Sequence, residues 1–126
     1  MELNNQEPLV RVERIPDEAL VVRGGRHRPA DIERGTGTHP SGVTGVSVES
    51  AVGLTVAELA ATIPHSQVGV TTVGEVRQLG GDVIRTAGRS PNHATLTGLT
   101  PEQASRLLAP TMPNPARKAS AWEKKI

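Results

Sequence analysis

One short segment combines residue types that bind phosphate groups. The apolar run Leu20–Val22 ends in Arg23, which is followed by Gly24 and Gly25. An arginine at the end of a buried strand can donate two parallel hydrogen bonds to a phosphate, and glycines let a ligand approach the backbone. The alternative interpretation is a surface ion pair at a strand end, with the two glycines forming a turn. The segment is a candidate anion site.

A histidine and a hydroxyl group that could take part in proton transfer lie further along the chain. His93 and Thr95 are two positions apart on a strand-like segment, and alternate residues of a strand share one face. His93 could move a proton while Thr95 holds a phosphate oxygen. The resulting hypothesis places Arg23, Ser47 and His93 around one cleft at adjacent strand ends, with Arg23 as an electrostatic clamp.

The glycine-rich loop over residues 24–42 also carries basic side chains. Arg26 and His27 extend the candidate anion site into this loop. Asp31 and Glu33 follow closely, and interspersed acids cancel most of a local positive field. The loop is therefore either part of a ligand site or a solvated segment whose charges balance.

The order of two of these motifs resembles that of ADP-ribosyltransferase-type toxins. Arg23 lies on an early strand, and Ser47 follows on the next strand, before an alanine-rich helix. The resemblance implies that Arg23 holds NAD, that the strand of Ser47 shapes the pocket, and that a later glutamate polarises the ribose. This sequence departs from the pattern because Glu75 and Glu102 fall in predicted helices and no aromatic residue is placed to stack on nicotinamide.

A broader pattern resembles short actinobacterial proteins of toxin-like or defence-associated type whose activity is unassigned. It runs Val-Val-Arg-Gly-Gly, Gly-Val-Ser-Val, Thr-Val-Gly-x-x-Arg-x-x-Gly, His-x-Thr and Leu-Leu, at residues 21–25, 45–48, 72–80, 93–95 and 107–108. The likeness implies one member of a two-protein module. The His-x-Thr element also resembles half of the paired motif of 2H phosphoesterases, although the only second half on offer, His39-Pro40-Ser41, is predicted to lie in a loop.

Composition excludes several functional classes. The 126 residues suit one small domain, and Trp122 is the sole aromatic residue, so base stacking on aromatic rings is excluded as a binding mode. A formal net charge of +1 gives no field for reading duplex DNA. The chain has no cysteine and no pair of histidines at helical spacing, so we expect no metal site and no cofactor other than NAD. No signal sequence or membrane span is predicted, which favours a cytoplasmic location.

Three threonines mark the helices that would position these residues. Thr55, Thr72 and Thr100 are each followed three positions later by Glu or Gln, the spacing of a capping box. Strand-like segments precede, separate and follow these helix starts, at residues 19–23, 43–49, 68–71, 82–86 and 93–97. The pattern predicts an α+β fold: a mixed four- to five-stranded sheet with about three short helices in a single layer.

The predicted organisation is one domain with an extension at each end. Residues 1–18 form an N-terminal arm or edge strand, residues 19–110 form the domain, and residues 111–126 form a proline-rich, then basic, flexible tail. We expect a nucleotide, NAD or RNA phosphate site at the strand ends. The alternative is a non-catalytic interaction subunit, anchored to a protein partner through Trp122 or through Leu9, Val10 and Val12.

Overall fold

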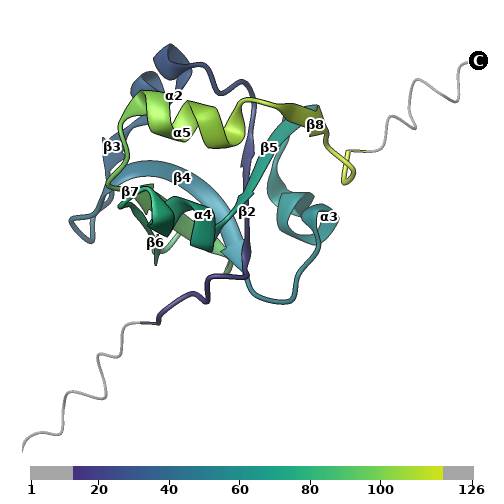
Figure 1. Ribbon diagram of the computed structural model, residues 1–126. Coiled ribbons are helices and arrows are strands. Elements are labelled where there is room, and N and C mark those ends of the chain that lie inside the picture. The colour runs from purple at the N-terminus through teal and green to yellow at the C-terminus, as the bar shows by residue number, and fades with distance from the viewer. Residues whose placement is uncertain (1–12, 118–126) are drawn as a thin grey trace, which may run out of the picture.

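The structure, a computed structural model, describes residues 13–117 and has an α+β fold (Figure 1). Its described strands form a seven-stranded sheet in the order β6-β7-β4-β2-β5-β8, with β3 paired to β4. The strands are β2 (Leu20–Gly24), β3 (Gly37–Thr38), β4 (Thr44–Ala51), β5 (Gln67–Thr72), β6 (Asp82–Arg85), β7 (His93–Thr97) and β8 (Thr111–Pro113). Alternating β-branched residues in β4 and β5 account for their extended conformation.

Three of the four described α-helices begin where the threonine capping pattern predicts, and the fourth, α2 (Pro29–Gly35), begins after Arg28. Thr55 and Thr100 each accept a backbone hydrogen bond at N3, and Glu58 and Gln103 return one, so both capping boxes are complete. Thr72 caps its helix by accepting from the Glu75 backbone N–H. The helices are α2 (Pro29–Gly35), α3 (Val56–Leu59) with the 3-10 helix Ala60–Thr62, α4 (Val73–Gln78) and α5 (Pro101–Leu108).

The two faces of the sheet bury different apolar clusters. Val21 belongs to the larger cluster, which packs under α2, α4 and α5 and includes Val76 and Leu108. Val22, the next residue of β2, points to the opposite face and packs with Leu59 beneath α3. Strand alternation therefore divides the core into a helix face, covered by α2, α4 and α5, and a second face covered in part by α3 (Figure 1).

Three details of the predicted fold are wrong. The described sheet has seven strands rather than four or five, because the two-residue β3 and the proline-containing β8 carry no alternating apolar pattern. Every strand pair in residues 13–117 is antiparallel, whereas a mixed sheet was expected. Helices lie on both faces rather than in one layer, since α3 packs against Val22 and Val68.

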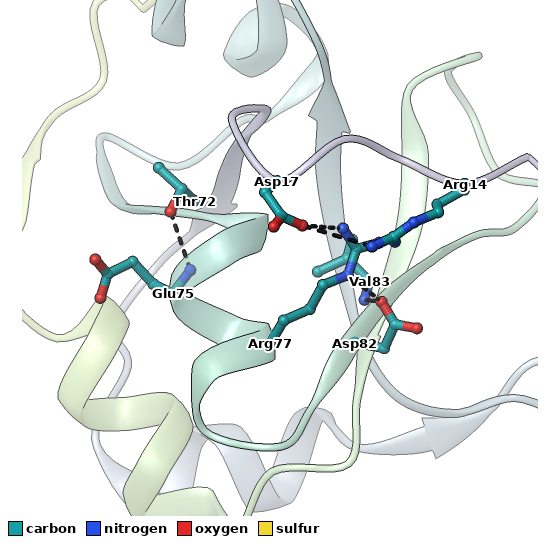
Figure 2. A network of polar contacts seen from close by, with 7 residues as sticks. All are labelled: Arg14, Asp17, Thr72, Glu75, Arg77, Asp82 and Val83. Carbon is teal, nitrogen blue, oxygen red and sulfur yellow. Dashed lines mark hydrogen bonds and ion pairs between the residues drawn. The ribbon is translucent and has the colours of Figure 1, made fainter.

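The packed unit extends past the predicted boundaries at residues 19 and 110. Ile15 is fully buried in the core, and Asp17 pairs with Arg77 of α4, which also bonds Asp82 of β6 (Figure 2). Within the described residues, no helix is long and apolar enough to cross a membrane. At the other end, β8 pairs with β5, and the next residue, Asn114, is buried.

Candidate functional site

A cleft opens where β2 and β4 separate. These strands pair from Leu20 with Ala51 as far as Val22 with Glu49, and beyond that point β2 continues beside β5 while β4 continues beside β7. The space between them is about 430 Å³, a volume typical of small-molecule sites. Its walls carry seven side chains able to bind ligands or transfer protons: Arg23, Ser47, Glu49, Thr62, His65, Arg89 and His93.

Arg23 is a half-buried cation that lines the cleft at the end of β2, and its guanidinium lies beside α2, where a Cβ atom at Gly35 would come within 2.4 Å of Nη2. Its Nη1 lies 3.5 Å from the carbonyl oxygen of Gly24, and its Nε is buried with no hydrogen-bond partner in the described residues. No carboxylate of residues 13–117 forms an ion pair with it. Burial lowers the pKa of Arg23, because charge is less stable away from water, while Asp31 acts in the opposite sense. A cation without a carboxylate partner is suited to a bound anion.

His93 is held in a defined orientation at the start of β7. Its Nδ1 lies 3.1 Å from the carbonyl oxygen of Thr86 and 3.0 Å from the Thr86 hydroxyl. A carbonyl oxygen only accepts hydrogen bonds, so Nδ1 carries the hydrogen and Nε2 carries the lone pair of the neutral ring. Nε2 has no hydrogen-bond partner among residues 13–117. The ring therefore presents a proton-transfer atom that remains available to a ligand.

The loop between β6 and β7 packs against the His93 ring. Gly88 lies so close that a Cβ atom there would come within 2.3 Å of His93 Cγ. The loop is tethered by His39, whose Nδ1 accepts from the Ser41 backbone N–H at 2.9 Å and whose Nε2 therefore donates to the Ala87 carbonyl at 2.9 Å. The His39 and His93 ring centroids are 6.2 Å apart.

Thr95 contacts the residue that orients His93 and does not line the cleft. It is buried, and its hydroxyl lies 2.9 Å from the hydroxyl of Thr86, the residue that orients His93. Ser47 pairs with Thr95 across β4 and β7, but its side chain is exposed and lines the cleft. The predicted grouping of Arg23, Ser47 and His93 thus occurs around one cleft, whereas Thr95 lines only a smaller neighbouring hollow of about 170 Å³.

The opposite wall follows the 3-10 helix and carries His65. Gly24 must be a glycine here, since a Cβ atom would approach Ile63 Cγ2 to 2.4 Å and His65 Nδ1 to 2.5 Å. The side-chain amide of Asn114 donates to the carbonyl oxygens of Ile63 and His65, at 3.1 and 2.9 Å. Residue 114, within the predicted flexible tail, therefore helps to shape the cleft.

The basic loop contributes less to the cleft than the sequence predicts. Of its candidate residues, Gly25 has a left-handed backbone conformation and a Cβ atom there would lie 3.4 Å from His65 Cδ2, Arg26 is exposed, and neither lines the cleft. His27 is buried, with a Cβ atom at Gly69 of β5 approaching its ring to 2.9 Å, and both ring nitrogens lack hydrogen-bond partners in the described chain. Burial, reinforced by the charge of Arg23, lowers the pKa of His27 to about 4, so the ring is neutral at physiological pH.

The remaining loop charges pair locally. Asp31 lies 2.8 Å from Arg28 and 2.5 Å from Arg34, and the hydrogen bond from Arg28 is the main cause that lowers the Asp31 pKa to about 2. This pairing agrees with the interpretation of a loop whose charges balance.

Among the ionisable residues of the cleft, Glu49, His65 and Arg89 escaped the sequence prediction. Glu49 is only 8% exposed, and its Oε1 accepts a hydrogen bond of 2.7 Å from the Ser90 hydroxyl. Alternation along β4 already places Glu49 on the same face as Ser47, and this signal could have identified it. Arg89 reaches the cleft from an irregular loop, for which the sequence gives no periodic signal.

Comparison with known proteins adds no relative to this geometry: no family model, curated protein or solved structure matches the chain.

Proposed function

We propose that the cleft between β2 and β4 binds the phosphate group of a nucleotide-class ligand and that His93 transfers a proton to or from the bound ligand. The ligand classes considered are nucleotides, NAD and RNA, in keeping with the toxin-like or defence-associated role that the sequence resemblance implies. The observation that carries the proposal is the convergence of Arg23, Arg89 and His93 on one cleft of about 430 Å³.

Charge supports an anionic ligand. Arg23 is partly desolvated and has no carboxylate partner in residues 13–117, and a phosphate placed there would gain charge-assisted hydrogen bonds. Arg89 is exposed on the facing loop and can approach the same anion. Overall neutrality of the chain does not oppose this, because a desolvated cation acts at short range.

Orientation supports a chemical role for His93. Histidines that act in proton transfer have one ring nitrogen fixed by a hydrogen bond so that the other faces the reacting group. Thr86 provides that bond, and Thr95 supports Thr86.

The test is a thermal-shift screen against NAD, ADP-ribose, nucleotides and short RNA. A ligand at 100 times its dissociation constant should stabilise the protein by about 2.7 kcal/mol. Arg23→Gln and Arg89→Ala should each reduce that stabilisation, because each removes a cation from the cleft. Arg106→Ala is the matched control, since Arg106 is an exposed arginine in the last turn of α5, outside the cleft.

Two outcomes would count against the proposal: no stabilisation by any phosphate-bearing ligand, or equal stabilisation in the wild type and in both cleft variants. Either would favour the alternative of a non-catalytic interaction subunit. The anchors of that alternative, Trp122 and Leu9, Val10 and Val12, lie outside the described residues. Its truncation test should begin at residue 118, because Asn114 supports the cleft wall.

A further inference from the structure

Glu49 is a buried carboxylate at the wall of the cleft. On its face of β4 the cross-strand neighbours are Val22 of β2 and His93 of β7. No lysine or arginine of the described residues forms an ion pair with it, and its recorded hydrogen bond comes from Ser90. Burying a carboxylate without a cation is costly, and an apolar residue would serve packing better. Glu49 is therefore a candidate for chemistry.

Register brings this carboxylate beside His93. The two residues are direct partners in the antiparallel pair of β4 and β7, so their side chains leave the same face with Cβ atoms about 5 Å apart. No ion pair or hydrogen bond joins them in the structure. Glu49 is tied to Ser90, while His93 is tied to Thr86, so each group is held by its own partner and both face one cleft.

Two proton-transfer groups beside a phosphate site restrict the chemistry. Cleavage of the glycosidic bond of NAD releases nicotinamide as a neutral molecule, which needs no proton from an acid. Cleavage of a ribonucleotide phosphodiester needs both a base for the 2′-hydroxyl and an acid for the departing 5′-oxygen. The second reaction uses the whole pair.

We propose that Glu49 and His93 are the general base and general acid for cleavage of an RNA phosphodiester. The inference rests on the phosphate site of the proposed function, in which Arg23 and Arg89 hold the phosphate. Recognition is then by charge and by the 2′-hydroxyl, which suits a described chain without any Phe, Tyr or Trp. Ser90 is a positioning residue, because it acts through Glu49.

The step balances in atoms and protons. Glu49 takes the proton of the 2′-hydroxyl while the 2′-oxygen forms a bond to phosphorus. The bond from phosphorus to the 5′-oxygen breaks, and protonated His93 gives its proton to that 5′-oxygen. The products are a 2′,3′-cyclic phosphate and a free 5′-hydroxyl. Water then returns the proton from Glu49 to His93, so no oxidant or reductant is involved.

The substrate for the test is a DNA oligonucleotide with one internal ribonucleotide, and the all-DNA oligonucleotide is the uncleavable binding probe. We expect cleavage at the ribonucleotide alone, with a 2′,3′-cyclic phosphate detected by mass spectrometry. Glu49→Gln and His93→Gln should each lower the cleavage rate 100-fold or more. Both should bind the all-DNA probe, measured by fluorescence anisotropy, within about threefold of wild type.

Matched variants separate chemistry from folding. Glu49→Gln keeps an oxygen that accepts the Ser90 hydrogen bond, and thermal unfolding verifies that it folds. Glu33→Gln, an exposed glutamate of α2, should cleave at the wild-type rate. Ser90→Ala should lower kcat by about tenfold with KM unchanged, because it releases the carboxylate from its position without altering the phosphate contacts.

The outcomes distinguish this inference from the proposed function. Arg23-dependent binding of the all-DNA probe with no cleavage of the ribonucleotide substrate would overturn the inference and leave the phosphate site standing. Cleavage by Glu49→Gln at the wild-type rate would overturn the role of Glu49. Absence of both binding and cleavage would overturn the inference, and the thermal-shift screen with NAD, ADP-ribose and nucleotides then decides the proposed function.

Discussion

The two faces of the sheet use the same strands for different purposes. On the helix face, Val21 and its neighbours lie under α2, α4 and α5 in one closed apolar cluster. On the opposite face, α3 covers Val22 and Val68, whereas the half formed by β4 and β7 presents Ser47, Glu49 and His93 to a cleft. Side-chain alternation therefore separates most of the apolar core from Ser47, Glu49 and His93, whereas Arg23 follows Val22 and its guanidinium lies beside Gly35 of α2.

The difference predicts that substitutions on the two faces have very different effects on stability. Leu108→Ala, at a fully buried position of the helix face, should lower the free energy of unfolding by about 3 to 4 kcal/mol, because it leaves a cavity. Ser47→Ala, at an exposed position of the cleft, should change it by less than about 0.5 kcal/mol. Chemical denaturation of both variants measures the contrast. Similar losses at the two positions would contradict the division into faces.

The helix face was also the more predictable of the two. Helical periodicity identifies Val73, Val76 and Leu108 as core residues, and the threonine caps predict the helix starts to within one residue. The α+β class follows from these patterns. The strand number and the uniform antiparallel pairing do not, because β3 and β8 exist through pairing with longer strands.

The cleft was predictable only in part. Motif logic grouped Arg23, Ser47 and His93, which line it together. The position at which β2 and β4 separate is a tertiary property, and it decides that Glu49 faces a cavity. The environment of His27 is likewise tertiary: a loop histidine between charged arginines looks solvated in sequence, yet its ring is buried near β5.

His27 offers the second test, because it is a buried polar group that does not line the cleft. Its folded pKa of about 4 lies below the ordinary value of 6.5, so the unfolded chain binds more protons between these pH values. Stability should therefore be full above pH 6.5 and fall as the pH drops toward 4, by at most about 3 kcal/mol. Denaturation midpoints at pH 7, 5.5 and 4.5 follow the loss.

The matched variant is His27→Leu. Neither His27 nitrogen has a hydrogen-bond partner of good geometry within residues 13–117, and the nearby backbone of Gly24 and Arg23 offsets only part of the burial, so an apolar side chain of similar size removes the titrating group at little cost. The variant should lose most of the stability difference between pH 7 and 4.5. An unchanged pH profile would show that other groups govern acid unfolding.

A smaller effect on stability should come from removing the N-cap of α5, a helix that covers the helix face of the sheet. Thr100→Ala removes the acceptor for the Gln103 backbone N–H and should destabilise α5 by about 1 kcal/mol. Since α5 carries Leu108 into the core, the loss should appear in global unfolding. Thr100→Ser keeps the hydroxyl and is the control. A loss as large in the serine variant would mean that the methyl group, rather than the cap, is responsible.

The smallest expected effect tests whether paired polar groups behave differently from those in the cleft. Arg77 is bonded to Asp17 and Asp82 at the edge of the helix face (Figure 2), whereas Arg23 has no carboxylate partner in the described residues. Asp17 is largely exposed, so Asp17→Asn should cost only about 0.5 kcal/mol, and the difference from wild type should shrink as salt is raised to 1 M. Denaturation at low and high salt measures both quantities. A loss above about 2 kcal/mol, insensitive to salt, would mean that Asp17 anchors the segment around Ile15 through packing, and that the edge of the helix face depends on a polar group as strongly as its centre depends on Leu108.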